Sequence, residues 1–254
     1  MAMMVAAPAI EQHPSPNHGP RAPGARVDIL LLHYTGMKTA EGALSWLSDP
    51  RSEVSSHYFI FEDGRTVQLV DEERRAWHAG RGIWAGEGDI NSRSIGIELA
   101  HPGHEHGYRA FAAPQIAALV ALSQGILARH PIPPERVLAH SDVAPDRKED
   151  PGELFPWQVL HAAGIGHWVQ PEPVVAGSVL KRGDRGGGVS DLQHRFRQYG
   201  YAIDEESDFG PVTEAVVVAF QRHFRQARFD GVADVSTVRT LDRLIATVPG
   251  RGMA

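Results

Sequence analysis

The stretch Val27-Asp28-Ile29-Leu30-Leu31-Leu32-His33 decides the fold of the first part of the chain. A short apolar run of this kind, closed by Gly36, predicts a buried β-strand. Outward from it, the hydrophobic periodicity predicts a helix at 39–47, a β-hairpin at 57–69, a strand at 94–99, a helix at 114–129, a strand at 136–140 and a helix at about 155–164. Because strands and helices alternate, we expect an α/β domain with a central mixed β-sheet flanked by helices.

The C-terminal third has a different character. Three amphipathic helical stretches, 189–199, 211–225 and 236–246, are separated by turns rich in Gly and Asp and predict a small all-α domain of three helices. A Pro- and Gly-bearing segment, QPEPVVAGS, precedes them. The expected organisation is a disordered tail at 1–24, an α/β domain at 25–168, a linker at 169–178 and the helical domain at 179–247.

Composition narrows the function classes. The chain has 254 residues, of which 42% are hydrophobic and 22% charged, an ordinary globular balance. A formal net charge of −6 argues against nucleic acid as the main partner, since phosphate binding needs a clustered basic surface. The absence of cysteine excludes disulfides, thiolate metal sites and cysteine nucleophiles. No apolar run approaches the roughly 20 residues that cross a bilayer.

The N-terminal segment lacks the features of a secretory signal. No basic residue precedes its apolar stretch at 3–7, and five prolines interrupt the residues from 8 to 23. This favours a cytoplasmic location. A periplasmic or cell-envelope location is the alternative if a native signal is missing from this sequence.

Two histidines and one aspartate suggest a metal site among the 14 histidines of the chain. His33 and His140 end predicted strands, and Asp150 lies beyond them in a loop rich in Pro and charge. Two imidazoles and one carboxylate form the three-ligand set with an open fourth position that catalytic zinc requires. Their wide separation in sequence leaves the alternative that they are ordinary surface or core residues.

Five blocks in order carry a more specific signal: HYTG at 33–36, SHY at 56–58, WHAG at 77–80, Asn91 with SIGIE at 94–98, and HSDVAP with KEDPG between 140 and 152. Together they resemble the type-2 N-acetylmuramoyl-L-alanine amidase family over residues 26–168. The resemblance implies the fold shared with phage amidases and peptidoglycan recognition proteins. It also implies a Zn²⁺ cofactor held by His33, His140 and Asp150.

The resemblance also implies roles for the other residues. Glu98 would be the base that takes a proton from the attacking water and passes it to the leaving amine; an ordinary surface glutamate is the alternative. Lys148 would stabilise the oxyanion, with a solvated loop lysine as the alternative. The residues expected to line or support the cleft, with plain packing as an equal alternative, are Tyr34, His57, Trp77, His78 and Asn91.

Two other motifs need weighing. His101, His104 and His106 lie close together in HPGHEHG, and short His-rich tracts can bind metal. We expect instead a solvated loop near the cleft mouth, because the loop has no fixed scaffold. The Gly-rich stretch at 183–188 lacks the Gly-Lys-Ser/Thr ending and the preceding strand of a phosphate-binding loop.

The C-terminal helices resemble the three-helix peptidoglycan-binding domain over 179–244. The matching features are LKRGD at 180–184, Val189, Leu192-Gln193, Gly200-Tyr201, FGPVT at 209–213, Ala215-Val216, Phe220-Gln221 and Asp230-Gly231. The sequence departs from the pattern at Glu206-Ser207-Asp208 and at 233–237. The helix faces stay apolar, so the module is expected to fold, whereas a role in docking alone is the alternative to glycan binding.

The resulting expectation is an enzyme that hydrolyses the amide between N-acetylmuramic acid and L-alanine of peptidoglycan or muropeptides. A catalytically silent peptidoglycan receptor on the same fold is the alternative, but such receptors typically lack a metal ligand and here all three are present. A zinc peptidase would need a motif such as His-Glu-x-x-His, which the sequence lacks. The preference between anhydro-ended and intact substrates, the stem peptide and the oligomeric state stay open.

Overall fold

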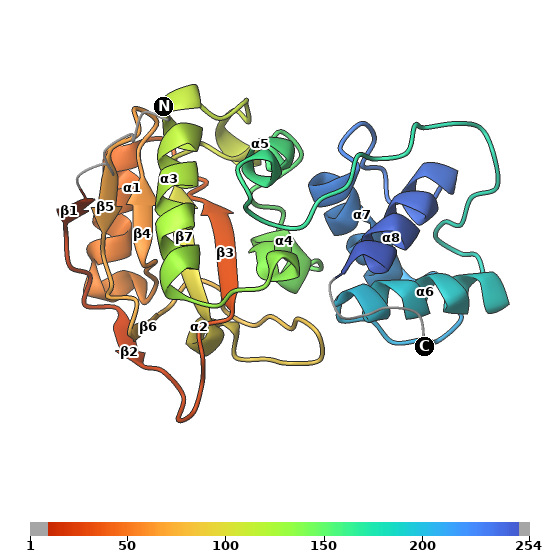
Figure 1. Cartoon of the computed structure of the whole chain (residues 1–254), viewed down its shortest axis with the longest axis horizontal. Helices are drawn as coiled ribbons and strands as arrows, with labels where there is room; N and C mark the ends of the chain where they lie inside the picture. Colours follow the sequence, from red (N-terminus) through yellow and green to blue (C-terminus); the bar gives the residue numbers. More distant parts are fainter. Residues whose placement is uncertain (1–9, 249–254) are drawn as a thin grey trace. The chain divides into compact units, whose positions relative to one another are not determined.

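The computed structural model describes residues 10–248 (Figure 1). The chain divides into two compact units. Over the described residues, the first comprises 10–80, 91–137 and 162–165, and the second comprises 81–90, 138–161 and 166–248. Two segments from within the predicted α/β domain therefore group with the C-terminal helices. The sequence-based boundaries at 168 and 179 stay a prediction.

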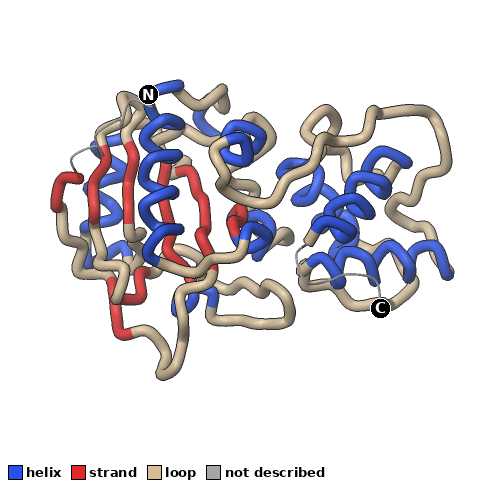
Figure 2. The backbone as a smooth tube through the Cα atoms, in the orientation of Figure 1, coloured by secondary structure: helices blue, strands red, loops and turns tan. Residues whose placement is uncertain are grey.

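A mixed six-stranded sheet, with strand order β1-β5-β4-β7-β3-β8, confirms the expected α/β class (Figure 2). Neighbours pair in parallel for β1 with β5, β4 with β7 and β7 with β3, whereas β4 and β5 form the predicted antiparallel hairpin. The strands are β1 Ile10–Gln12, β3 Ile29–Tyr34, β4 Tyr58–Ile60, β5 Thr66–Gln68, β7 Ser94–Leu99 and β8 Val137–Ala139; a separate pair is formed by β2 His18–Pro20 and β6 Arg74–Ala76.

The two central strands are the apolar runs of the sequence. Ile29 to Leu32 of β3 are fully buried, as are the isoleucines and the leucine of β7. Side chains of a strand alternate between the two faces of the sheet, so a run without alternation must be covered on both sides. Figure 1 shows α3 (Ala113–Arg129) running across the sheet. On one face, α1 (Ala40–Ser48) packs Ala43 and Leu47 into a core with Phe59 and Val67.

The predicted disordered tail at 1–24 is wrong from Ile10 onward; residues 1–9 lie outside the described residues. Strand β1 pairs with β5, and β2 pairs with β6. Between them, the Ser15 hydroxyl donates to the Leu47 carbonyl at 2.6 Å, and the Asn17 amide donates to the Asp49 carbonyl at 2.8 Å. The segment is ordered because buried polar side chains and an edge strand, which tolerates nearby prolines, anchor it.

The helix predicted at about 155–164 is observed as α5, whereas the other short helical elements were not predicted. His140 does not end a strand but begins α4, because β8 stops at Ala139. The shorter elements are η1 Pro50–Ser52, α2 Ile90–Arg93, η2 His104–His106, η3 Pro134–Arg136, α4 His140–Val143 and α5 Trp157–Ala162. Strand β6 and helix α2 were not predicted, because both are short and mostly polar, with the sequences RRA and INSR.

The three predicted C-terminal helices are present as α6 (Gly187–Tyr199), α7 (Pro211–Phe224) and α8 (Val235–Thr247). A buried glutamine repeats in the first two. Gln193 donates to the Asp208 carbonyl and accepts from the Ser207 N–H, as Gln221 donates to the Val232 carbonyl and accepts from the Gly231 N–H. The turn after α6 and the turn after α7 therefore have the same hydrogen bonds, although Ser207 in the first stands where Gly231 stands in the second.

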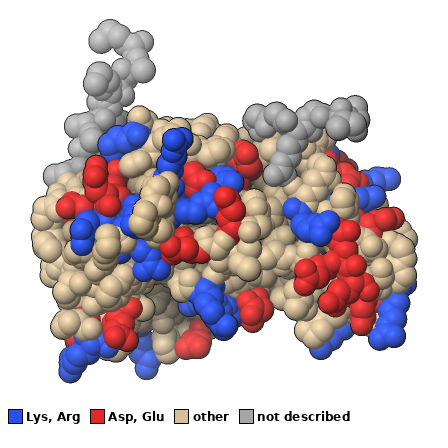
Figure 3. Space-filling model, turned by 90° about the horizontal axis from the view of Figure 1, so that it is seen from below, with Lys and Arg blue, Asp and Glu red and all other residues tan. Residues whose placement is uncertain are grey.

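The segment before α6 is attached along α8. The Glu172 N–H donates to the Thr240 hydroxyl at 3.0 Å, and the Ser236 hydroxyl donates to the Glu172 carbonyl at 2.6 Å. Over 10–248, no helix has the length and apolar character to cross a membrane. Acidic and basic side chains are interspersed over the face in Figure 3.

Candidate metal centre

His33, His140 and Asp150 come together as the sequence predicts. Each offers one ligand atom, and these atoms lie within 4.8 Å of one another. All three side chains are buried, with residue exposures of 1%, 2% and 6%. Among the described residues this is the group of three His, Cys, Asp or Glu side chains that could hold a metal ion.

A loop whose two ends are hydrogen-bonded brings His140 and Asp150 together. Nδ1 of His140 lies 3.1 Å from Oδ2 of Asp150, and the Ser141 N–H donates to the Asp150 carbonyl at 3.1 Å. The backbone bond closes the ten-residue loop at its base. The two side chains therefore meet because the loop ends are tied together, not because they are close in sequence.

His33 is oriented by a second histidine. Nε2 of His33 lies 3.0 Å from Nδ1 of His78, and Nε2 of His78 lies 3.2 Å from the Ser94 hydroxyl. The two rings meet edge to face, with centroids 5.0 Å apart. Gly96 makes room for this arrangement, because a Cβ at this position would lie 2.5 Å from Nδ1 of His78.

Hydrogen bonds of Asn91 and Trp77 hold the backbone around His78. The Asn91 side-chain oxygen accepts from the N–H groups of His78 at 3.1 Å and Ala79 at 2.8 Å. The Trp77 N–H donates to the Ser55 hydroxyl at 2.9 Å. These contacts fix the loop that carries His78. A direct role for either side chain in lining the cleft stays a prediction.

His57 is fully buried in the same region. Its Nδ1 accepts from the Gly96 N–H at 2.9 Å, and its Nε2 lies 3.0 Å from the Arg74 carbonyl and 3.1 Å from a guanidinium nitrogen of Arg21. Burial lowers the pKa of His57 to about 3, although the bond to Arg74 opposes the shift. The ring is therefore neutral at physiological pH and holds the backbone of β7 beside His78.

Glu98 lies next to His33 in the sheet. The two residues are partners in the parallel register of β3 and β7, so their side chains project from the same face. Glu98 is partly exposed, as a group that exchanges protons with a ligand must be. Lys148 is also partly exposed, in the loop before Asp150, where its backbone N–H donates to the Ala144 carbonyl at 3.0 Å.

The loop that carries His101, His104 and His106 is not solvated throughout. His101 is buried and stacks on Phe111, its Nδ1 accepts from the Gly103 N–H, and its Nε2 lies 2.9 Å from the Arg109 carbonyl. Its two ring nitrogens are thus engaged with the backbone. His104 stacks on Tyr108 and bonds through Nδ1 to the Tyr34 hydroxyl at 2.8 Å. Tyr34 therefore anchors this loop beside β3.

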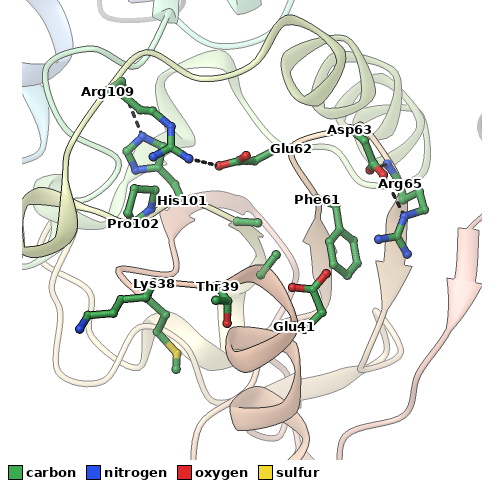
Figure 4. A pocket seen from close by; sticks show the side chains of 13 residues that line it. Lys38, Thr39, Glu41, Phe61, Glu62, Asp63, Arg65, His101, Pro102 and Arg109 are labelled. Atoms are coloured by element: carbon green, nitrogen blue, oxygen red, sulfur yellow. Dashed lines mark hydrogen bonds and ion pairs between the residues drawn. The ribbon is translucent and has the colours of Figure 1, made fainter.

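A pocket of about 360 Å³ lies in the first unit (Figure 4). Its walls follow the ends of three parallel strands, since residues 37–41 come after β3, residues 61–65 after β4 and residues 100–102 after β7. Ligands of α/β proteins typically bind at this edge of the sheet. The charged side chains around the pocket are Lys38, Glu41, Glu62, Asp63, Arg65 and Arg109. Two salt bridges form among them, Arg65 with Asp63 and Arg109 with Glu62, and Figure 4 shows both.

Sequence reasoning missed Asp142 and Ser94 as part of the centre's surroundings. Both lie inside quoted blocks, HSD and SIGIE, beside neighbours with more obvious chemistry. A polar residue that begins an apolar strand, as Ser94 does, or that follows a proposed ligand by two positions, as Asp142 does, is the signal that could have found them, because buried polar groups need partners.

Comparison with known proteins agrees with this geometry. The model of the family described as N-acetylmuramoyl-L-alanine amidase matches residues 23–153, and the model described as a putative peptidoglycan binding domain matches residues 185–241. The N-acetylmuramoyl-L-alanine amidase AmiD of Escherichia coli K12 is 37% identical over 87% of this chain and 83% of its own length.

Two solved structures cover nearly the whole chain. One is E. coli AmiD in complex with the substrate anhydro-N-acetylmuramic acid-L-Ala-D-γ-Glu-L-Lys, with a TM-score of 0.75 and 35% identity, covering 89% of this chain and 91% of that one. The other is AmpDh3 of Pseudomonas aeruginosa in complex with anhydromuramic pentapeptide, with a TM-score of 0.70 and 32% identity, covering 86% and 91%. The chain is therefore a member of the N-acetylmuramoyl-L-alanine amidase family, and its C-terminal region matches the putative peptidoglycan binding domain.

Proposed function

We propose that this enzyme hydrolyses the amide between N-acetylmuramic acid and L-alanine in anhydro-ended peptidoglycan fragments, with Zn²⁺ bound by His33, His140 and Asp150. The observation that carries the proposal is the position of Glu98 beside His33, one of the three proposed ligands, on the same face of the sheet. A ligand and a proton acceptor on neighbouring strands are what a metal-assisted hydrolysis needs.

The donor set fits zinc. Two imidazoles and one carboxylate, all buried, match the three protein ligands of catalytic zinc sites, and the cysteine-free chain offers no softer alternative. Bound there, zinc would lower the pKa of its water ligand towards about 7 and polarise the amide carbonyl.

The histidine pair would set the tautomer of His33. If His33 binds the metal through Nδ1, its Nε2–H donates to Nδ1 of His78, and the Nε2–H of His78 donates to the Ser94 hydroxyl. This chain of donors fixes both rings. Glu98 would accept the proton of the attacking water and return it to the departing L-alanine nitrogen. Lys148 would donate to the oxygen that gains negative charge.

The choice of an anhydro-ended substrate rests on the two relatives whose structures hold such ligands. The charged pocket of Figure 4 would accommodate the stem peptide. Its cationic side chains would pair with the carboxylates of that peptide, and its carboxylates with the amines. The C-terminal helices would add contact with the glycan. The predicted cytoplasmic location stays a prediction.

Product analysis tests the proposal. The purified protein is incubated with matched anhydro-ended and reducing-end muropeptides, with chelator and after zinc add-back, and the products are identified by mass spectrometry. We expect release of a stem peptide with a free L-alanine amino group, lost with chelator and restored by zinc. The anhydro-ended substrate should be cleaved faster.

The Glu98→Gln variant separates catalysis from binding. It should retain stoichiometric zinc while activity falls by on the order of 10²–10⁴-fold, the range that a general base contributes. An exposed glutamate outside the centre, Glu105, serves as the matched control when changed to Gln. A zinc-loaded wild-type protein that binds muropeptides without cleaving either one would contradict the proposal and favour the receptor.

A further inference from the structure

Asp142 is a fully buried carboxylate two residues after His140, and the proposed reaction does not use it. Its Oδ2 accepts from the Ala139 N–H at 2.8 Å. Ala139 precedes His140 at the start of α4, so this bond caps the turn that presents the His140 ring. A buried carboxylate is costly unless donors surround it. The donors to Asp142 therefore identify what holds this turn in place.

The other two donors come from the C-terminal helical region. The Tyr201 hydroxyl donates to Oδ1 of Asp142 at 2.6 Å, and Nδ1 of His223, in α7, lies 2.7 Å from Oδ2. An ionised carboxylate only accepts, so Nδ1 of His223 carries the proton. All three residues are buried and belong to the second compact unit.

Aromatic packing fixes the two donors. The Trp157 ring stacks on His223 with centroids 3.6 Å apart, and Trp84 meets the Tyr201 ring edge to face at 5.0 Å. Gly200 permits the second contact, because a Cβ there would lie 2.6 Å from the Trp84 ring and its φ is +145°. Neither donor can turn away from Asp142 without disturbing a packed indole.

Helix α7 also reaches the other end of the same loop. The Arg222 guanidinium donates to Glu149 at 2.9 Å and lies 3.4 Å from Glu153, so it contacts residues on both sides of Asp150. Neighbouring residues of one helix, Arg222 and His223, are thus attached to both ends of the loop that supplies two of the three proposed ligands.

We propose that Tyr201 and His223 are positioning residues for the metal centre. Through Asp142 they hold the first turn of α4 and, with it, the ring of His140. The region that matches a peptidoglycan-binding domain is thereby also a structural part of the catalytic centre. This inference rests on the proposed role of His140 as a ligand. A contact that served folding alone would leave the affinity and geometry of the centre unchanged.

The test uses the full chain and four variants. Tyr201→Phe removes one hydroxyl and keeps the packed ring. His223→Leu removes the donor, and His223→Asn restores an N–H donor near the place of Nδ1. Tyr199→Phe is the matched control, because this buried tyrosine also contacts Trp84 but bonds to His167 rather than Asp142.

Three quantities are measured for each protein: zinc affinity by competition with a chromogenic chelator, the absorption spectrum of the Co²⁺-substituted protein, and kcat and KM with an anhydro-ended muropeptide. We expect Tyr201→Phe and His223→Leu to weaken zinc binding about 3- to 10-fold, below the ~10–100-fold of groups that touch a ligand directly. Their kcat should fall with KM little changed and their Co²⁺ spectra should shift. His223→Asn should recover part of each loss, and Tyr199→Phe should match wild type.

Equal zinc affinities and Co²⁺ spectra in Tyr201→Phe, His223→Leu and Tyr199→Phe would overturn the inference, whatever their melting temperatures. The metal readouts keep this outcome separate from failure of the proposed function. A wild-type protein that binds the metal ions but cleaves no muropeptide would contradict the amidase proposal, while the metal affinities would still decide the role of Tyr201 and His223.

Discussion

Gly96 leaves room for the imidazole of His78, which occupies the position where a side chain of residue 96 would project from β7. Since His78 in turn holds Nε2 of His33, the absence of a side chain at residue 96 determines where a proposed ligand lies.

Gly96→Ala should therefore impair the metal centre. A methyl group 2.5 Å from Nδ1 of His78 must displace the ring, which breaks its bond to His33. We expect zinc affinity to fall about 10-fold or more and stability by about 1–3 kcal/mol, measured by chelator competition and urea unfolding. Gly19→Ala is the control, because a Cβ there meets its nearest neighbour at 4.0 Å. Wild-type zinc affinity in Gly96→Ala would show that His78 does not orient His33.

Zinc should stabilise the wild-type protein and not the Asp150→Asn variant. A ligand that binds only the folded state adds about 4.1 kcal/mol at 1,000 times its Kd. Melting temperature is followed with chelator and with excess zinc. Asp146→Asn changes an exposed carboxylate of the same loop and should keep the full zinc response. A response in Asp150→Asn equal to that of wild type would remove Asp150 from the ligand set.

Lys148→Met should lower kcat by about 10²-fold, near the lower end of what one oxyanion donor contributes, with zinc affinity retained. Methionine keeps the length of the side chain without its charge. Steady-state kinetics on a defined muropeptide give the answer. Lys181→Met, an exposed lysine in the C-terminal region, is the control. If both variants turn over at the wild-type rate, Lys148 is a solvated loop residue.

His57 should make folding stability depend on pH below about 6.5. Burial lowers its folded-state pKa to about 3, whereas the ring in the unfolded chain binds a proton near its ordinary pKa of 6.5. The unfolded state therefore holds more protons between these values, and stability falls as pH falls, by up to about 1.4 kcal/mol per pH unit. Above pH 6.5 this contribution is fully present.

Urea unfolding of the metal-free protein at pH 7.5 and 5.5 tests this. His57→Asn, which keeps an acceptor for the Gly96 N–H, should be less stable at pH 7.5 but should lose less on acidification than wild type. Titration of the His57 ring above pH 5 in an NMR spectrum would contradict the buried neutral state.

Ser207→Gly should stabilise the protein. Ser207 has a φ of +57°, a left-handed conformation that the equivalent Gly231 adopts at +75°. A non-glycine residue costs about 1–2 kcal/mol there, offset by about 0.5–1 kcal/mol of glycine chain entropy. We expect a gain of about 0.5–1 kcal/mol in urea unfolding. The reverse change, Gly231→Ser, should destabilise; a gain in that variant would show that the turns are not equivalent.

The sequence predicts the long periodic elements and the hairpin β4–β5 well, but it misses several short elements. The runs at β3, β7 and α3 give their positions because the pattern covers many residues. Strands β1 and β2 were missed because proline-rich polar sequence resembles a tail, and only tertiary partners such as the Leu47 carbonyl order it.

For the site, the recurring motifs identify the residues, but not what supports them. The three proposed ligands could be named from the blocks that contain them. The donors to Asp142 could not, because Tyr201 and His223 lie 59 and 81 residues further along the chain in a region that resembles a separate module. Hydrogen bonds between distant segments leave no periodic pattern in a sequence.

The position of Glu98 relative to His33 depends on the parallel register of β3 and β7. Slippage of one strand against the other by one residue would send Glu98 to the opposite face while His33 stayed in place. The apolar side chains of these two strands, such as Leu32 and Ile97, are fully buried, and they favour this register because slippage would expose part of them. Sequence drift in the hydrophobic core could therefore silence the enzyme while every catalytic residue is preserved, and a silent receptor could arise on this fold without losing a ligand.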